Sequence, residues 1–232
     1  MKVALVIPAA GRGKRLKTAS PKALVRVLGR PILIHTVSAL ERSFHFYEMV
    51  VLAPANQVER FRNVLKRFGF GNVCVVPGGR TRAESVKNGV KSVSDICEWV
   101  LVHDAARPLV DARMIRRLIR AAKKTGAAIT AALVTSTVKR VNLKRRVLVG
   151  TENRDLLVMA QTPQIFKKNL LMNRYKALGT RALLATDEAA LFDGTQTQVR
   201  VVPGDEKNIK VTTPEDIELF KFYLNGRHSE RA

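Results

Sequence analysis

Residues 3–15 read VALVIPAAGRGKR, an apolar run that turns directly into a loop of small and basic residues. The run Val3–Ile7 holds no polar residue, which is typical of a strand buried on both faces of a parallel sheet. Pro8 ends the run, and the small residues after it let backbone N–H groups approach a phosphate closely. A signal peptide is the alternative for such a start, but the basic loop that follows favours a buried strand.

The same alternation of apolar strand and amphipathic helix continues along the chain. Further strands are expected at residues 49–52, 73–76, 99–102, 128–134 and 199–202. Helices are expected around residues 31–40, 61–68, 85–93, 111–124, 167–178 and 188–192, and from Pro214 onward. This pattern predicts an α/β fold with a mostly parallel sheet and helices on both faces. Ligands then bind beyond the carboxyl ends of the strands.

The alternation breaks at residues 137–150, within an arm that we place at residues 137–154. Val138–Val141 and Val147–Gly150 flank a short polar link, which predicts a β-hairpin that projects from the sheet. A hairpin with so few apolar residues is not stable alone. We expect it to pack on another surface, and a second copy of the chain is one candidate. We expect residues 1–232 to form a single domain, of which this arm is a part.

The charge balance points to anionic partners. The sequence has 41 Lys and Arg against 19 Asp and Glu, a net charge of +22. Such a field attracts nucleic acid, anionic membranes or phosphorylated substrates. Aromatic residues are few, so any nucleic-acid binding is expected to be weak and non-specific. The sequence contains no apolar run of about 18 residues, so we expect no membrane helix. We expect a cytoplasmic protein in which Cys74 and Cys97 are buried free thiols.

Two segments carry candidate chemistry. The loop after Pro8 is not a G-x-x-x-x-G-K-[ST] motif, and Leu16 replaces the third glycine of G-x-G-x-x-G, so a solvated surface turn is the alternative to a phosphate loop. Asp104 follows the strand at 99–102. A lone carboxylate at that end of a sheet suits Mg²⁺ or a ribose hydroxyl, or else forms a structural pair with Arg107.

Seven motifs occur in a fixed order along residues 3 to about 220. They are Pro8-Ala-Ala-Gly-Arg-Gly-Lys-Arg15, Pro21-Lys22, Gly78-Gly-x-x-Arg82-x-x-Ser85-Val86, His103-Asp-Ala-Ala-Arg-Pro108, Thr162-Pro-Gln164, Thr186-Asp-Glu188 and Asn208-Ile-Lys-Val-Thr-x-Pro-Glu-Asp216. The ordered set closely resembles the 2-C-methyl-D-erythritol 4-phosphate cytidylyltransferase family of the non-mevalonate isoprenoid pathway. The resemblance implies a Rossmann-like fold of the nucleotide-diphosphosugar transferase type, Mg²⁺ as cofactor, and CMP transfer from CTP to a sugar-type phosphate.

The resemblance also implies a role for each matching position. Pro8, Ala9, Ala10, Gly11 and Gly13 would wrap CTP, Gly79 and Ser85 would read cytosine, and Asp104 and Ala105 would hold the ribose and the metal. Arg15, Lys22 and Lys210 would be the catalytic cations. Arg107, Thr162, Thr186 and Lys210 would surround the acceptor phosphate. Thr137 and Arg154 would reach the site of a second copy, because the resemblance implies a homodimer formed through the arm.

Some positions depart from the family pattern. Arg80 and Ser136 stand where aspartate is common, and Ala23-Leu24 replaces a bulkier pair. If the backbone at residue 80 reads cytosine, the preference for CTP is kept; if the side chain reads it, a preference for CTP no longer follows from the resemblance. The rival hypotheses are a cytidylyltransferase for ribitol 5-phosphate, a nucleic-acid-binding protein, and an inactive or regulatory homologue.

Overall fold

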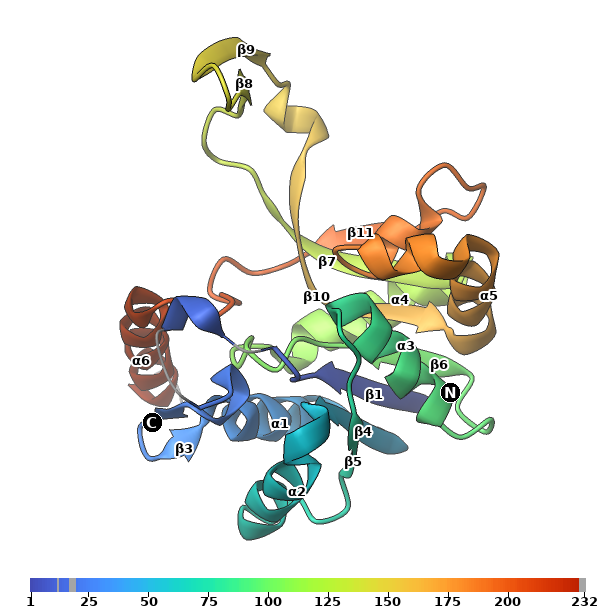
Figure 1. Cartoon of the computed structure of the whole chain (residues 1–232), viewed down its shortest axis with the longest axis vertical. Coiled ribbons are helices and arrows are strands. Elements are labelled where there is room, and N and C mark those ends of the chain that lie inside the picture. Colours follow the sequence, from blue (N-terminus) through green and yellow to red (C-terminus); the bar gives the residue numbers. More distant parts are fainter. Residues whose placement is uncertain (12, 17–19, 230–232) are drawn as a thin grey trace.

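The computed structural model describes residues 1–11, 13–16 and 20–229. Within these residues, a seven-stranded sheet forms the centre of the body, and a two-stranded arm projects away from it (Figure 1). The strands in chain order are β1 (Val3–Pro8), β4 (Glu48–Ala53), β5 (Cys74–Pro77), β6 (Trp99–Val102), β7 (Ala127–Leu133), β10 (Val158–Lys167) and β11 (Arg200–Pro203). Their order across the sheet is β11-β7-β10-β6-β1-β4-β5.

The helices cover both faces of this sheet, as predicted. They are α1 (Ile32–Ser43), α2 (Val58–Arg67), α3 (Arg82–Ser92), α4 (Ala112–Thr125) and α5 (Lys168–Leu178). Helix α6 (Pro214–Ser229) lies beside the sheet, where its Phe220 packs against Val27 and Ile32. Successive side chains of a strand point to opposite faces. Leu5 and Ile7 of β1 therefore join the core under α1, α2 and α4, whereas Ala4 and Val6 join the core under α3 and α5. All four are fully buried, so the strand is apolar throughout.

Strand β10 was not predicted, and it is the antiparallel member of the sheet. It lies between β6 and β7 and runs antiparallel to both, whereas the other pairs of the sheet are parallel. Its apolar pattern is interrupted at Gln161, Thr162, Pro163 and Gln164, and the pairing with β7 shifts register at this point. Proline is tolerated in a strand at such an irregularity. Because these polar residues interrupt the apolar pattern, periodicity did not predict this strand.

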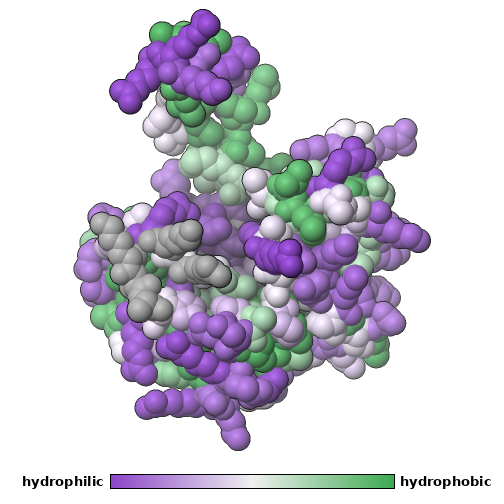
Figure 2. Space-filling view, in the orientation of Figure 1, coloured by the Kyte–Doolittle hydropathy of each residue, from purple (hydrophilic) through white to green (hydrophobic). Residues whose placement is uncertain are grey.

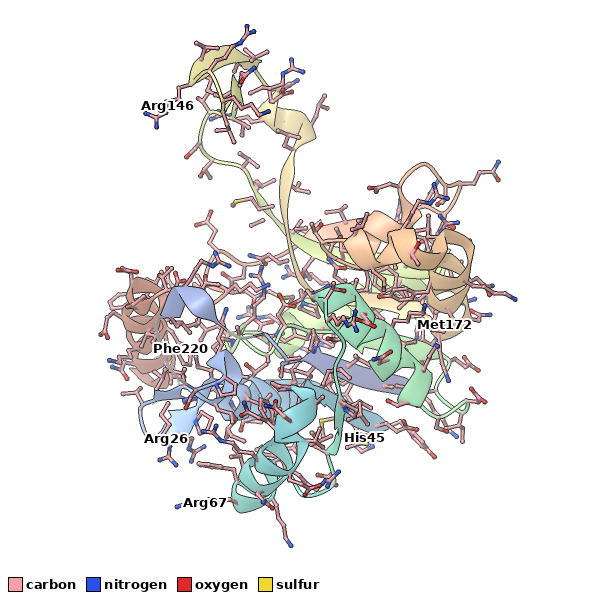
Figure 3. All side chains as sticks on the ribbon, in the orientation of Figure 1. Arg26, His45, Arg67, Arg146, Met172 and Phe220 are labelled. Carbon is pink, nitrogen blue, oxygen red and sulfur yellow. The ribbon has the colours of Figure 1, made fainter. Side chains whose placement is uncertain are left out.

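The predicted arm is confirmed as a hairpin of β8 (Lys139–Asn142) and β9 (Val147–Thr151). Figure 3 shows Arg146 on this hairpin, with its side chain extending to the side of the arm. Apolar side chains gather along the stem of the arm, and hydrophilic ones at its tip (Figure 2). Its exposed apolar residues, with the adjoining ends of β7 and β10, are Leu133, Val141, Leu143, Val147, Leu148, Val149, Leu156, Leu157, Val158 and Met159.

The prediction for one cysteine was wrong. Cys97 is buried, but Cys74 is exposed. Cys74 begins β5, the strand at one edge of the sheet. An edge strand has a neighbouring strand on one side only, whereas a central strand has one on each side. Among the described residues, no helix has both the length and the apolar character needed to cross a membrane.

Candidate active site

A cleft of about 1120 Å³ opens beyond the carboxyl ends of β1, β4, β5 and β6. This is the edge of the sheet where the alternation of elements predicted a ligand site. Ten of the residues predicted for the site line the cleft. They are Pro8, Ala9, Ala10, Gly11, Lys22, Gly79, Ser85, Asp104, Ala105 and Lys210. The fold thus brings together residues as far apart in the sequence as Pro8 and Lys210.

The first wall of the cleft is the loop after β1. The Ala9 N–H donates to the carbonyl of Leu52 on the neighbouring strand at 2.9 Å. Gly13 has a φ of +61°, and a Cβ atom there would lie 2.5 Å from Cβ of Lys22. Any larger residue at this position would therefore be strained and would displace Lys22. Arg12 and residues 17–19 of the predicted phosphate loop, like residues 230–232 of the tail, lie outside the described residues.

A buried ion-pair cluster centred on Asp104 forms the floor of the cleft. Asp104 is 6% exposed; its Oδ1 lies 3.1 Å from Nε of Arg82, and its Oδ2 lies 2.7 Å from Nζ of Lys210 and 3.9 Å from Nε of Arg107. Burial by itself would raise the pKa of Asp104, but these three cations outweigh it and hold the pKa well below its usual range. Asp104 is therefore ionised at neutral pH. Arg107, which the sequence offered as an alternative structural partner, is one of its three cationic partners.

Arg82 and Glu188 are parts of the site to which the sequence assigned no role. Nη1 and Nη2 of Arg82 donate to the two carboxylate oxygens of Glu188 at 2.9 and 3.0 Å, while its Nε donates to Asp104. Glu188 is fully buried. A guanidinium that forks onto one carboxylate and reaches a second holds both in a fixed orientation. Both residues stand in motifs quoted above, but their pairing across 106 residues has no sequence signal.

The backbone that carries Asp104 is tied to the surrounding elements. The Asp104 N–H donates to Oγ1 of Thr162 on β10 at 3.0 Å, and Oγ1 of Thr36 on α1 donates to the Ala105 carbonyl at 2.8 Å. The Val211 N–H donates to the Ala106 carbonyl at 2.9 Å, which brings the neighbouring Lys210 to the cluster. Two predicted site residues thus contact Asp104: the Thr162 hydroxyl accepts from its backbone N–H, and the Lys210 ammonium contacts its carboxylate.

His103 and Arg107 have structural contacts behind the cleft. A ring nitrogen of His103 lies 2.8 Å from the Arg107 carbonyl, and Nη1 of Arg107 donates to the Asn208 carbonyl at 2.6 Å. Burial lowers the pKa of His103 to about 4, so its imidazole is neutral at physiological pH. His103 is therefore a structural histidine and not a proton relay.

Lys22 and Lys210 face the same space from two loops. Burial, together with the positive charges of Lys210 and Arg15, lowers the pKa of Lys22 to about 8, while the negative charge of Asp104 opposes this shift. Two ammonium groups and an adjacent guanidinium repel one another across a partly desolvated cleft. The cleft is therefore prepared for a strongly anionic ligand, which would relieve this repulsion.

The loop between β5 and α3 forms the opposite wall. Thr81 caps α3, and its Oγ1 accepts from the Glu84 N–H at 3.1 Å. Oγ of Ser85 accepts from the Gly79 N–H at 2.9 Å and donates to the Thr81 carbonyl at 2.8 Å. Ser85 therefore shapes the loop that was predicted to read the base. The side chain of Arg80 is exposed, and its N–H donates to the Glu84 carboxylate at 2.6 Å.

Several predicted site residues do not line this cleft. Arg15 is exposed on a short 3₁₀ turn, and Thr186 is exposed before Glu188. Thr137 and Arg154 lie on the exposed arm, where Nη1 of Arg154 donates to the Thr135 carbonyl at 2.9 Å. Gly13 supports Lys22 from behind, and Arg107 and Thr162 support Asp104. Thr137 and Arg154 do not line the cleft of their own chain, so a role in binding would require the cleft of a second copy.

A family model described as 2-C-methyl-D-erythritol 4-phosphate cytidylyltransferase matches residues 3–226. The chain belongs to this family. It is 39% identical to a family member of Solibacter usitatus and 38% identical to one of Alkaliphilus metalliredigens, covering 97% of this chain and 96% and 94% of those proteins. A bifunctional enzyme IspD/IspF of Desulfotalea psychrophila is also 38% identical, but the chain spans 57% of its length.

Solved structures of the family share the fold. A 4-diphosphocytidyl-2C-methyl-D-erythritol synthase from Anaerococcus prevotii superposes with a TM-score of 0.83 at 31% identity, covering 97% of this chain and 98% of that one. The 2-C-methyl-D-erythritol 4-phosphate cytidylyltransferase of Thermus thermophilus gives 0.77 at 30% identity, with coverages of 94% and 96%. The predicted fold class is confirmed by these structures and by the seven-stranded sheet.

The carboxylates that line the cleft are few. They are Glu84 and Asp104, and the described residues contain no group of three His, Cys, Asp or Glu side chains arranged to hold a metal. Mg²⁺ commonly binds proteins through one or two carboxylates and takes its other ligands from substrate phosphates and water. The cleft fits a metal held in that way, and it does not fit one held by a protein cage.

Arg82→Ala should destabilise the fold because it leaves the buried charge of Glu188 without a partner. The free energy of unfolding, measured by urea denaturation, is expected to fall by about 3–5 kcal/mol. The double variant Arg82→Met, Glu188→Leu removes both charges and should recover most of this loss. A single variant as stable as the parent chain would contradict the role of the pair.

The lowered pKa of Lys22 predicts a fall in activity on the alkaline side. Lys22 is a cation below about pH 8 and loses its charge as the pH rises through that value, so kcat/KM for CTP should decline above it. In Lys22→Arg the guanidinium stays charged, and any activity that remains should keep its value to higher pH. An unchanged profile in Lys22→Arg would assign the titration to another group.

Proposed function

We propose that this chain transfers CMP from CTP to 2-C-methyl-D-erythritol 4-phosphate, giving 4-diphosphocytidyl-2-C-methyl-D-erythritol and pyrophosphate. The family and the names of its relatives support this reaction. The observation that carries the proposal is the convergence of Lys22, Lys210 and Asp104 at one cleft beside the glycine-rich loop. Such a cleft is built for a triphosphate and a second phosphorylated molecule.

Charge neutralisation is the first requirement of this reaction. Both substrates are polyanions, and two like unit charges 4 Å apart repel by about 4 kcal/mol at an effective dielectric constant of 20. Lys22, Lys210 and the nearby Arg15 offset this repulsion and can hold the α-phosphate of CTP in line with the attacking oxygen. That oxygen attacks the α-phosphorus as the bond to pyrophosphate breaks.

The reaction needs no general base in this cleft. A phosphate monoester loses its second proton at a pKa of about 6, so the attacking oxygen is already ionised near neutral pH. The residues of the cleft agree with this chemistry, because His103 is buried against the Arg107 carbonyl and no histidine is among the described residues that line the cleft. The protein then contributes positioning and electrostatic stabilisation.

We include Mg²⁺ in the proposal as the cofactor that neutralises the triphosphate. Asp104 is the predicted protein ligand, and its two oxygens already contact Arg82 and Lys210. Lys210 is the more exposed of these partners, with 40% of its side chain accessible. Arg82 and Glu188 therefore keep the carboxylate oriented whether its second oxygen contacts Lys210 or another cation.

We further propose a homodimer in which the arm of one copy completes the cleft of the other, in a cytoplasmic protein. The exposed apolar residues of the arm stem need a cover, and isologous pairing of two arms would provide one. Thr137 and Arg154 lie outside their own cleft and become site residues in such a pair. The free thiols of Cys74 and Cys97 are compatible with a reducing cytoplasm.

The reaction is tested by incubating the chain with CTP, Mg²⁺ and methylerythritol phosphate, followed by mass detection of the CDP-linked product. Ribitol 5-phosphate as the acceptor should give far less product. Lys22→Ala should lower kcat at least about 100-fold, and EDTA should abolish turnover. The exposed Lys91→Ala serves as the matched control. A product formed only with ribitol 5-phosphate would overturn the substrate assignment.

Site sharing across the dimer predicts recovery of activity on mixing two inactive variants. In a Lys22→Ala/Arg154→Ala heterodimer, one of the two sites has both native residues. After subunit exchange, about a quarter of the parental activity should return, because half of the dimers are mixed and each has one intact site. No recovery, with mixed dimers verified by mass spectrometry, would place Arg154 outside the partner's site.

A further inference from the structure

Helix α4 presents an unbroken stripe of cations to solvent. Its exposed residues Arg113, Arg116, Arg117, Arg120, Lys123 and Lys124 recur at intervals of one, three or four positions, which places them on one side of the helix. The helix contains no acidic residue. In the part of the chain that the structure describes, none of the six forms an ion pair.

The stripe is separate from the catalytic cleft. None of its six residues lines the cleft. It continues at the C-terminal end of α4 into a hollow of about 380 Å³, whose lining includes Lys123, Lys124, Lys167, Asn169 and Asn173. The proposed transfer reaction therefore uses none of these cations, and like charges held together in this way repel one another. An external anion would relieve that repulsion.

We propose that this α4 surface binds the phosphate backbone of nucleic acid. With a rise of 1.5 Å per residue, the stripe from Arg113 to Lys124 is about 16 Å long, or one cation for about every 3 Å. A strand of duplex DNA carries one phosphate per about 3.4 Å of axis. The linear charge densities are thus matched. The stripe has no aromatic residue for stacking on bases, so binding is independent of sequence.

The structure favours nucleic acid over a membrane as the partner. Helices that bind the membrane interface insert an apolar face into the lipid. The apolar face of α4 is instead committed to the protein core, where Met114, Ile115, Leu118 and Ala122 are at most 1% exposed. Only the charged side is free to meet a partner. A fixed row of charges on a rigid helix fits a regular polyanion, which a phosphodiester chain provides.

The test measures binding of the full chain to fluorescein-labelled nucleic acid by anisotropy over a range of salt concentrations. A short DNA duplex and an RNA strand of equal length are compared, because both carry the same phosphodiester chemistry. The α4 variant is Arg116→Glu, Arg117→Glu, Arg120→Glu. The control variant is Lys66→Glu, Arg67→Glu, Lys91→Glu, which lowers the net charge equally on α2 and α3; Arg67 projects from the body away from the arm (Figure 3).

The parent chain should bind with a slope of log K against log salt of about −4 to −5, which corresponds to about five phosphates. The α4 variant should bind at least about tenfold more weakly with a slope reduced by about three, while the control changes little. Both variants should keep CMP transfer, which reports an intact fold. If the charge reversal does not fold, Arg116→Gln, Arg117→Gln, Arg120→Gln replaces it.

Three results would overturn the proposal. Equal losses in the α4 and control variants would show that only net charge matters. Unchanged binding by the α4 variant would place the contact elsewhere. Binding to phosphatidylglycerol vesicles without binding to either nucleic acid would identify a membrane surface instead. Retained CMP transfer with any of these results would leave the proposed catalytic function intact.

Discussion

The site depends on one buried carboxylate and the cations that surround it. Asp104 lies at the end of the central strand β6, and burial of its charge is tolerated only because Arg82, Arg107 and Lys210 surround it. Arg82 is in turn anchored by the fully buried Glu188. The position of each charge is thus set by the others, so the floor of the cleft is rigid before any substrate arrives.

This arrangement divides the cations into two kinds. Arg82 and Arg107 are mostly buried and have protein partners, so their charge is used within the protein. Lys22 and Lys210 line the cleft, and Lys210 contacts Asp104 while 40% of its side chain stays accessible. Burial and the repulsion from Lys210 together lower the pKa of Lys22. Their charge is available to phosphates. A pre-arranged excess of positive charge in a partly desolvated cleft stabilises the charge that develops during phosphoryl transfer at little reorganisation cost.

The arm and α4 are features of the surface that the cleft does not explain. The arm leaves apolar side chains exposed, and α4 leaves six cations without ion pairs among the described residues. Exposed apolar patches and concentrated like charges both indicate partners, of different chemistry. Of the +22 excess, six charges are ordered along one helix face rather than scattered over the surface. The helical spacing of these residues already predicts one shared face, and the fold leaves that face exposed.

The sequence by itself determined the strand and helix alternation, the loop after β1, and the position of Asp104, because periodicity and glycine-rich loops are local patterns. It did not reveal β10, whose buried Gln161, Thr162 and Gln164 break the apolar pattern, nor the exposure of Cys74 at a sheet edge. The Arg82–Glu188 pair also depended on the tertiary structure. A contact between residues 106 positions apart is decided by sheet order and burial, and neither of these is a property of a local segment.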